Sequence, residues 1–284
     1  MSDDAKNPDL PRRSFIRLIG KWTVVAGALS VGVETMKHLP TAAASESIIS
    51  RYPPQGPVPG YNWLDHHWAF AVDATRCIGC LRCVEACKIE NDVPFNPYNT
   101  RTWVERYVYL DGEKEPHVDS IDDPRDIAAA GTRMNYRFAD LYEGQKVDQA
   151  FFIPKLCNHC TNPTCVEVCP TGASYQTPDG VVLIDKTYCI GCRYCVQACP
   201  YGARYFNEQT NTADKCTWCY HRITKGMKTA CVEACPTHAR KIGDLKDPNS
   251  DVSVFIRENR VQVLKPEMGN QPNVFYVGLN KDVC

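Results

Sequence analysis

Cysteines are the residues of this chain whose number and spacing could do chemistry. Sixteen of the 17 fall between Cys77 and Cys235, in four motifs that all end in C-x3-C. Two of the motifs carry the run C-x2-C-x2-C, which is typical of proteins that bind iron–sulfur clusters. The motifs consist of Cys77, Cys80, Cys83 and Cys87 (motif one); Cys157, Cys160, Cys165 and Cys169 (motif two); Cys189, Cys192, Cys195 and Cys199 (motif three); and Cys216, Cys219, Cys231 and Cys235 (motif four).

The spacing has a geometric reason. Two-residue gaps let a short loop wrap around one cubane, and Gly79 and Gly191 within such gaps can adopt positive φ. The three-residue gap places the third and fourth cysteines at i and i+4, on one face of a helix. The fourth thiolate then lies a turn away from its own loop, and in two-cluster ferredoxins it binds the other cluster. Proline follows the fourth cysteine in motifs two to four, whereas Lys88 follows it in motif one.

Other cysteine chemistries fit less well. Zinc also accepts four thiolates, but its sites normally present two C-x2-C pairs separated by a longer finger. The odd number of cysteines and the length of 284 residues argue against a disulfide framework. No C-x-x-C-H is present, which excludes covalent c-type haem on this chain. A zinc-stabilised structural protein therefore remains the remote alternative.

Several side chains within or beside the motifs have open roles. His159 either donates a hydrogen bond to a cluster sulfur or fills its loop. Trp218 lies between two cysteines, and we interpret it as a cover that keeps water from a cluster and so tunes its potential. Basic side chains next to the cysteines either offset cluster charge or lie on the surface: Arg82, Lys88, Arg193 and Lys215.

Short elements must hold the cysteine loops. The alternating run 68–72 predicts a strand before motif one, and residues 180–185 predict another before motif three. This repeat of strand, cysteine loop and short helix indicates an α+β fold of two pseudo-symmetric ferredoxin-like units, each with two cubanes. We predict that this domain covers residues 68–245 and follows a linker rich in proline and glycine at 45–67.

Two segments depart from the repeat. Residues 111–150 contain ten acidic and five basic residues and no cysteine. We interpret them as an inserted, solvated segment, with a docking surface as the alternative. Residues 246–284 form a C-terminal tail, whose apolar stretch 274–278 either adds a strand or lies on a partner. Cys284 belongs to no motif, and we interpret it as a free thiol.

The N-terminus resembles an export signal. Arg12-Arg13 precede a short apolar run, then Pro40 and the small residues 42–44, which is the order of a secretory signal. The paired arginines resemble a twin-arginine signal, although Pro11 stands where Ser or Thr is usual. The apolar run is too short for a membrane span of ~20 residues. We predict a signal at 1–44 and a periplasmic location, on the outer face of the cytoplasmic membrane; a retained helix lying against a partner is the alternative.

Taken together, the four motifs resemble one family. Their order, with spacings x2-x2-x3, x2-x4-x3, x2-x2-x3 and x2-x11-x3, is similar to the four-cluster iron–sulfur subunit of dimethyl sulfoxide, polysulfide and tetrathionate reductases. The resemblance covers about residues 68–245 and implies four 4Fe–4S clusters. The ligand sets that it implies are Cys77, Cys80, Cys83 and Cys235; Cys216, Cys219, Cys231 and Cys87; Cys157, Cys160, Cys165 and Cys199; and Cys189, Cys192, Cys195 and Cys169.

The resemblance also implies a role and partners. The role is that of a non-catalytic electron-transfer subunit, and the sequence contains no Ser/His/Asp set or phosphate-binding glycine loop. The implied partners are a molybdopterin catalytic subunit and an integral membrane subunit that reacts with quinone. Because lysine-rich cytochromes favour acidic partners, residues 111–150 leave open a complex with multihaem cytochromes and no molybdenum subunit. The net charge of -1 does not indicate a nucleic-acid partner.

Overall fold

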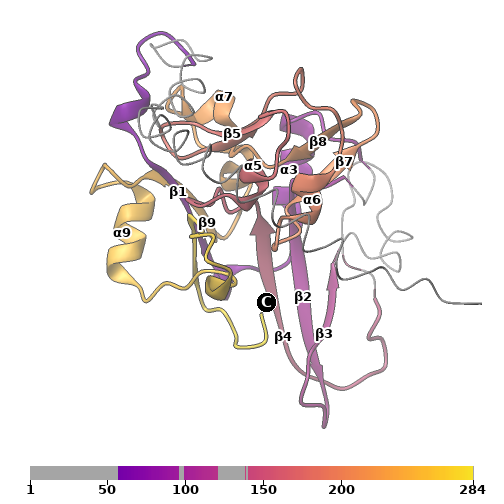
Figure 1. The fold of residues 1–284 in the computed structure, drawn as a ribbon. Coiled ribbons are helices and arrows are strands. Elements are labelled where there is room, and N and C mark those ends of the chain that lie inside the picture. Colours follow the sequence, from indigo (N-terminus) through magenta and orange to yellow (C-terminus); the bar gives the residue numbers. More distant parts are fainter. Residues whose placement is uncertain (1–56, 96–98, 121–137, 139, 284) are drawn as a thin grey trace, which may run out of the picture. The chain divides into compact units, whose positions relative to one another are not determined.

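The computed structural model of the protein describes residues 57–95, 99–120, 138 and 140–283. The chain divides into two units, Met1–Pro54 and Gln55–Cys284, and every described helix and strand belongs to the second unit (Figure 1). The predicted export signal, the first part of the predicted linker and Cys284 lie outside the described residues. Within those residues, no helix is long and apolar enough to cross a membrane.

The first sheet joins the strand before motif one to the end of the chain. β1 (Trp68–Asp73) pairs antiparallel with β9 (Arg240–Asp244) and parallel with β10 (Val274–Val277). β1 is fully buried from residue 69 to residue 72, because strands flank it and α9 (Asp251–Glu258) covers one face. The strand predicted at 68–72 is therefore confirmed, and the apolar stretch of the tail adds a strand to the same sheet.

The second sheet lies between motifs one and two. β2 (Thr102–Leu110) is its middle strand, with β3 (His117–Ser120) on one side and β4 (Val147–Leu156) on the other (Figure 1). Asp119 of β3 is buried and pairs with Arg106 of β2 at 2.6 Å. Because β4 ends one residue before Cys157, this sheet positions motif two.

Two hairpins hold motifs two to four. β5 (Ser174–Gln176) pairs with β6 (Val182–Ile184) between motifs two and three, which confirms the strand predicted at 180–185. β7 (Arg204–Asn207) pairs with β8 (Thr212–Lys215) between motifs three and four. The shorter elements are α7 (Tyr220–Ile223) and the 3-10 turns η1 (Trp63–Asp65), η2 (Ala74–Arg76) and η3 (Pro266–Met268).

The helices that carry the C-x3-C endings differ from the prediction in three motifs. In motif one, α3 (Arg82–Glu90) contains both Cys83 and Cys87. The other three helices are single turns that end two residues before the fourth cysteine: α5 (Thr164–Glu167), α6 (Tyr194–Gln197) and α8 (Ala230–Glu233). The prediction of one continuous helix is wrong there, because the following proline disfavours helical geometry at the cysteine before it. Lys88 in motif one allows α3 to continue.

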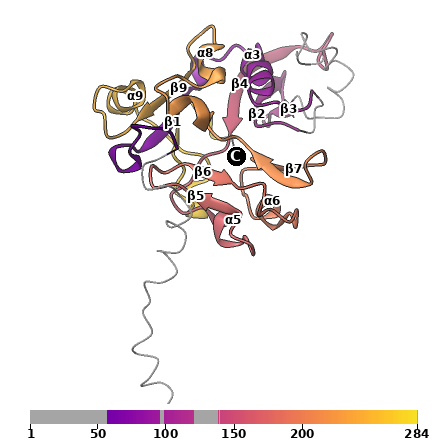
Figure 2. The ribbon, with the colours of Figure 1, turned by 90° about the horizontal axis from the view of Figure 1, so that it is seen from above.

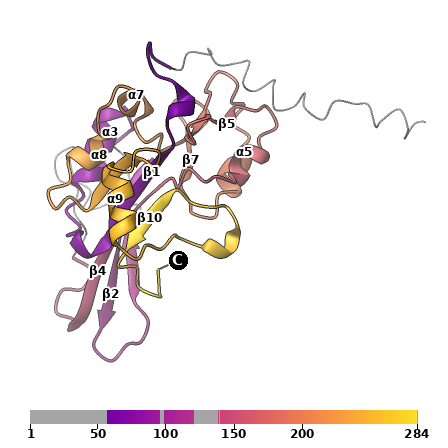
Figure 3. The same ribbon diagram turned by 90° about the vertical axis from the view of Figure 1, so that its left-hand side faces the viewer.

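The helices pack in two pairs that join different motifs. α3 lies against α8, so motif one meets motif four (Figures 2 and 3). α5 lies against α6, so motif two meets motif three (Figure 2). The main hydrophobic core lies among these elements, and its buried members include Phe70, Ile153, Trp218 and four cysteines of motifs one, two and four.

Candidate metal centres

Motif one and the end of motif four surround one cavity. Its lining includes Cys77, Cys80, Cys83 and Cys235, together with Thr237, Ala239 and Arg240. The predicted positive φ of Gly79 is confirmed at 66°, and a Cβ there would lie 2.4 Å from the Phe152 ring. The loop can therefore follow β4 closely only with glycine at this position.

Motif two and the end of motif three surround a second cavity. Its lining includes Cys157, Cys160, Cys165 and Cys199, together with Tyr201 and Arg204. The pattern is the same as in the first cavity: three cysteines of one motif face the fourth cysteine of another. Asn158, His159 and Asn270 also line this cavity.

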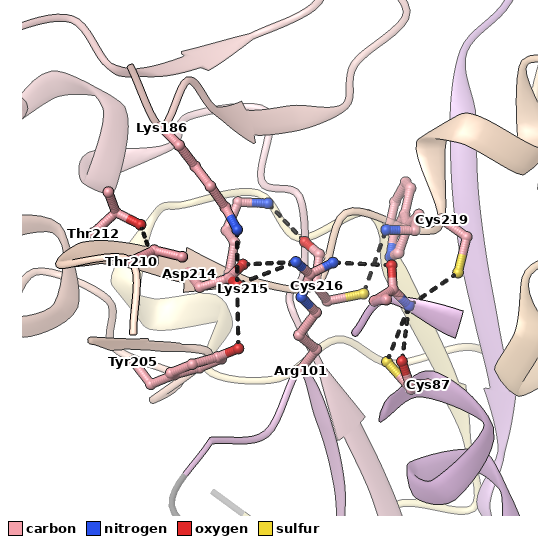
Figure 4. A network of polar contacts seen from close by, with 12 residues as sticks. Cys87, Arg101, Lys186, Tyr205, Thr210, Thr212, Asp214, Lys215, Cys216 and Cys219 are labelled. Carbon is pink, nitrogen blue, oxygen red and sulfur yellow. Dashed lines mark hydrogen bonds and ion pairs between the residues drawn. The ribbon is translucent and has the colours of Figure 1, made fainter. Parts of the chain in front are cut away.

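The third group joins Cys87 of motif one to three cysteines of motif four, and all of them are buried: Cys87, Cys216, Cys219 and Cys231. The side-chain amide of Asn91 donates to the sulfurs of Cys87 at 3.6 Å and Cys219 at 3.7 Å. Arg101 donates to the Asn91 oxygen at 2.9 Å. It also pairs with Asp214 at 3.0 Å (Figure 4). The amide nitrogen is thereby turned toward sulfurs of two different motifs.

The remaining cysteines are Cys169 of motif two and three of motif three. Cys192 is exposed, Cys189 and Cys169 are half-buried, and Cys195 is buried, as Cys80, Cys77, Cys235 and Cys83 are around the first cavity. Backbone N–H groups donate to the sulfurs of Cys189 and Cys169, each at 3.4 Å, from Ala213 and Ser174 respectively. The φ of Gly191 is 70°, as predicted. The packing of α5 against α6 brings the segments of Cys169 and Cys195 side by side.

Comparison with known proteins gives the family. Two family models described as "4Fe-4S dicluster domain" match residues 76–173 and 148–245, and together they include all four motifs. A tetrathionate reductase subunit of Salmonella typhimurium is 43% identical over 277 residues, covering 96% of this chain and 90% of that protein. A sulfite dehydrogenase subunit of Allochromatium vinosum is 40% identical, covering 75% and 83%, respectively. The thiosulfate reductase electron transfer subunit of Salmonella typhi is 37% identical, covering 70% and 86%.

The chain belongs to this family of iron–sulfur subunits. As predicted, the protein has an α+β fold of two ferredoxin-like dicluster domains and carries four 4Fe–4S clusters. Its cavities fit such groups, because sulfurs surround each space instead of converging on one point. In the ranges that the structure describes, no three His, Cys, Asp or Glu side chains are close enough to hold a single metal ion.

In this iron–sulfur subunit, burial disfavours the thiolate form of the core cysteines when no iron is bound. Burial raises the pKa of Cys83 and of Cys216 to about 12. Because iron binds the thiolate, cluster assembly must release these protons. Cys169 and Cys235 differ. Although burial alone would raise the pKa of each, hydrogen bonds from backbone N–H groups and from Thr171 and Thr237 lower it, with hydroxyl-to-sulfur distances of 3.7 Å.

His159 fills its loop and does not donate to a cluster sulfur. Its Nδ1 accepts from the Val182 N–H at 2.9 Å, and its Nε2 donates to the Cys216 carbonyl at 3.0 Å. Burial lowers the pKa of His159 well below its usual value, so the ring is neutral. Trp218 is 1% exposed and stacks on this ring at 4.1 Å between centroids. The two buried, stacked rings form a contact between motif two and motif four.

The basic side chains beside the cysteines fall into two classes. Lys88 and Lys215 are buried and donate to carbonyl groups, Lys88 to Pro94 and Asn99 and Lys215 to Val182 and Cys216. Arg82 and Arg193 are exposed.

Other residues near the sulfurs were not predicted from the sequence. Asn91, Arg101 and Asp214 carry no local signal. Arg204 and Arg240 could have been found from a repeated C-P-x-x-A-R pattern.

Proposed function

We propose that this protein carries electrons within a membrane-associated respiratory oxidoreductase complex and is not itself a catalyst. It connects a molybdopterin catalytic subunit to an integral membrane subunit that reacts with quinone. The observation that carries the proposal is the set of four cysteine motifs in a chain 43% identical over almost its whole length to a tetrathionate reductase subunit. The named relatives belong to complexes for sulfur oxyanions, so we propose such a substrate for the catalytic partner.

The proposed ligand sets combine three cysteines of one motif with the fourth of its mate. The two cavities support the first and third of these sets, and the Asn91 contacts support the second. The packing of α5 on α6 supports the fourth. The sets are Cys77, Cys80, Cys83 and Cys235; Cys216, Cys219, Cys231 and Cys87; Cys157, Cys160, Cys165 and Cys199; and Cys189, Cys192, Cys195 and Cys169.

The clusters supply one-electron oxidation and reduction when they are bound. The residues of the chain hold them at fixed positions and keep water away from the buried sets. Solvent and partner proteins can reach exposed cysteines at two loops of the same sequence, C-I-G-C, which contain Cys80 and Cys192. Beside them, Ile78 and Ile190 are 57% and 67% exposed. We propose that these two apolar loops contact the redox partners.

The proposed location is the outer face of the cytoplasmic membrane. The support is the predicted twin-arginine signal at residues 1–44. Export of the folded chain would allow clusters to be inserted in the reducing cytoplasm first. Replacing Arg12 and Arg13 with lysine should leave the chain in the cytoplasm with its clusters; unchanged export would count against the proposal.

The decisive experiment is the metal content of the complex that is purified anaerobically with this chain from solubilised membranes. We expect about sixteen irons per chain, from four clusters of four irons. Molybdenum or tungsten in stoichiometric amount supports a molybdopterin partner. Excess iron as haem, without molybdenum or tungsten, would favour multihaem cytochrome partners instead, in line with the acidic segment 111–150. Zinc in place of iron would overturn the proposal.

A further inference from the structure

Two buried arginines occupy equivalent positions in the two ferredoxin-like units. One unit consists of motifs one and four, and the other of motifs two and three. Arg204 follows Cys199 by five residues, and Arg240 follows Cys235 by five, each in the pattern C-P-x-x-A-R. Each arginine begins a strand, β7 or β9, that leaves a cluster site. They are 4% and 2% exposed. The corresponding position holds Ser174 after motif two and Asp92 after motif one, so each unit has one such arginine.

Among the residues that the structure describes, neither guanidinium forms an ion pair with a carboxylate. Nε, Nη1 and Nη2 of Arg204, and Nη1 and Nη2 of Arg240, are buried and have no hydrogen-bond partner of good geometry in the described part of the chain. Arg101 is also buried, but an ion pair with Asp214 at 3.0 Å compensates its charge. A buried cation without a partner is strongly unfavourable unless an anionic group lies beside it. The two arginines therefore indicate that their cavities hold negative charge.

The surroundings of each arginine identify that charge. Arg204 lines the cavity of motif two, and Arg240 lines the cavity of motif one. Burial alone would lower the pKa of both guanidinium groups, but neighbouring thiolates raise it above its usual value. Those thiolates are Cys165, Cys157 and Cys195 around Arg204, and Cys83, Cys231 and Cys77 around Arg240. Each arginine thus lies among cysteines of both ligand sets of one unit.

We propose that Arg204 and Arg240 are the buried counter-charges of the clusters, and that each raises the reduction potentials of both clusters in its own unit. Reduction adds one negative charge to a cluster, and a nearby cation in a medium of low dielectric stabilises the reduced form more than the oxidised form. The chain thereby sets the potentials of its clusters in two pairs. This inference rests on the ligand sets proposed above.

The test is a redox titration of the complex purified anaerobically, followed by electron paramagnetic resonance. Arg240→Met should lower the midpoint potentials of two clusters, and Arg204→Met should lower those of the other two. The expected result is two separate pairs of shifted signals, which requires no earlier assignment of each signal. Arg76→Met is the matched control, because this arginine precedes Cys77 but is exposed, where water and salt screen its charge. It should leave all four potentials close to those of the wild type.

The outcomes separate charge from structure. Shifts of the same clusters by both variants, shifts of all four, or no shift would overturn the proposal. If a methionine variant loses iron, Arg→Lys at the same position must restore both iron and potentials, since it keeps the positive charge. Failure of both substitutions would show that side-chain fit is what matters, and it would also overturn the proposal. A wild-type complex without four reducible clusters would instead refute the ligand sets.

Discussion

At the scale of single residues, Asn91 connects cysteines of two different motifs. Its amide nitrogen faces the sulfurs of Cys87 and Cys219, and Arg101 fixes that orientation by donating to its oxygen. An N–H donated to a cluster sulfur stabilises the more negative, reduced form. Asn91→Leu should therefore lower the midpoint potential of one cluster. The free energy of its reduction should become less favourable by roughly 1 kcal/mol, the net value of one hydrogen bond. The measurement is the same redox titration.

The matched control for Asn91 is Asn259. Both asparagines follow the last residue of a helix and donate to the carbonyl four residues earlier, at 2.9 Å for Asn91 and 3.0 Å for Asn259. Only Asn91 also contacts sulfur. Asn259→Leu should therefore leave all four potentials unchanged. An equal shift in both variants would show that the change is a general effect of weakening a helix end.

Residue roles are predictable from the sequence where the chemistry is local. The cysteines and the two glycines are recognisable because each motif occupies a short stretch. Asn91 is not recognisable, because Cys219, which it contacts, is 128 residues away in the chain. Arg101 and Asp214 are likewise separated by 113 residues. The role of His159 stayed open for the same reason, since one of its partners lies in another motif.

At the scale of elements, the loop of motif three depends on Gly191. Its φ is 70°, and a Cβ would lie 2.7 Å from the backbone oxygen of Asn211 in the turn between β7 and β8. Gly191→Ala should displace that turn and lower the iron content by about one cluster per chain. Gly202→Ala is the control, because its φ is 64° but a Cβ there has no neighbour within 4 Å.

The comparison of the two glycines separates backbone strain from the clash. The left-handed conformation disfavours any L-residue by roughly 1–2 kcal/mol, which both variants share. We therefore expect both to unfold at a lower temperature, while only Gly191→Ala loses iron. Iron analysis beside thermal unfolding checks this, and equal iron loss from both would point to strain alone.

Strands were predicted correctly where a short apolar run precedes a cysteine motif, as for β1 and β6. The sheet of β2, β3 and β4 was missed. The acidic residues around β3 suggested a solvated segment, whereas its pairing with β2 depends on tertiary contacts such as Arg106–Asp119. Helix length was overestimated in three motifs, because the proline after the fourth cysteine disfavours helical geometry at that cysteine.

At the scale of the whole molecule, the clusters and the hydrophobic core are one structure. Cys83, Cys157, Cys216 and Cys231 belong to the same buried cluster of side chains as Phe70 and Trp218. The two ferredoxin-like units meet where His159 of motif two donates to the Cys216 carbonyl of motif four. The helix pairs α3–α8 and α5–α6 bring motif one to motif four and motif two to motif three, which is the arrangement that the proposed ligand sets require.

Removal of iron should therefore unfold the described domain. A chelator under anaerobic conditions would leave empty cavities in the core, and Arg204 and Arg240 would remain buried without a counter-charge. Because metal binding and folding are coupled, we expect circular dichroism and iron release to change together. The double variant Arg204→Met/Arg240→Met removes the unpaired charges, so its iron-free form should keep more secondary structure than that of the wild type. Equal loss of structure in both would mean that the cavities, and not the buried cations, make the iron-free fold unstable.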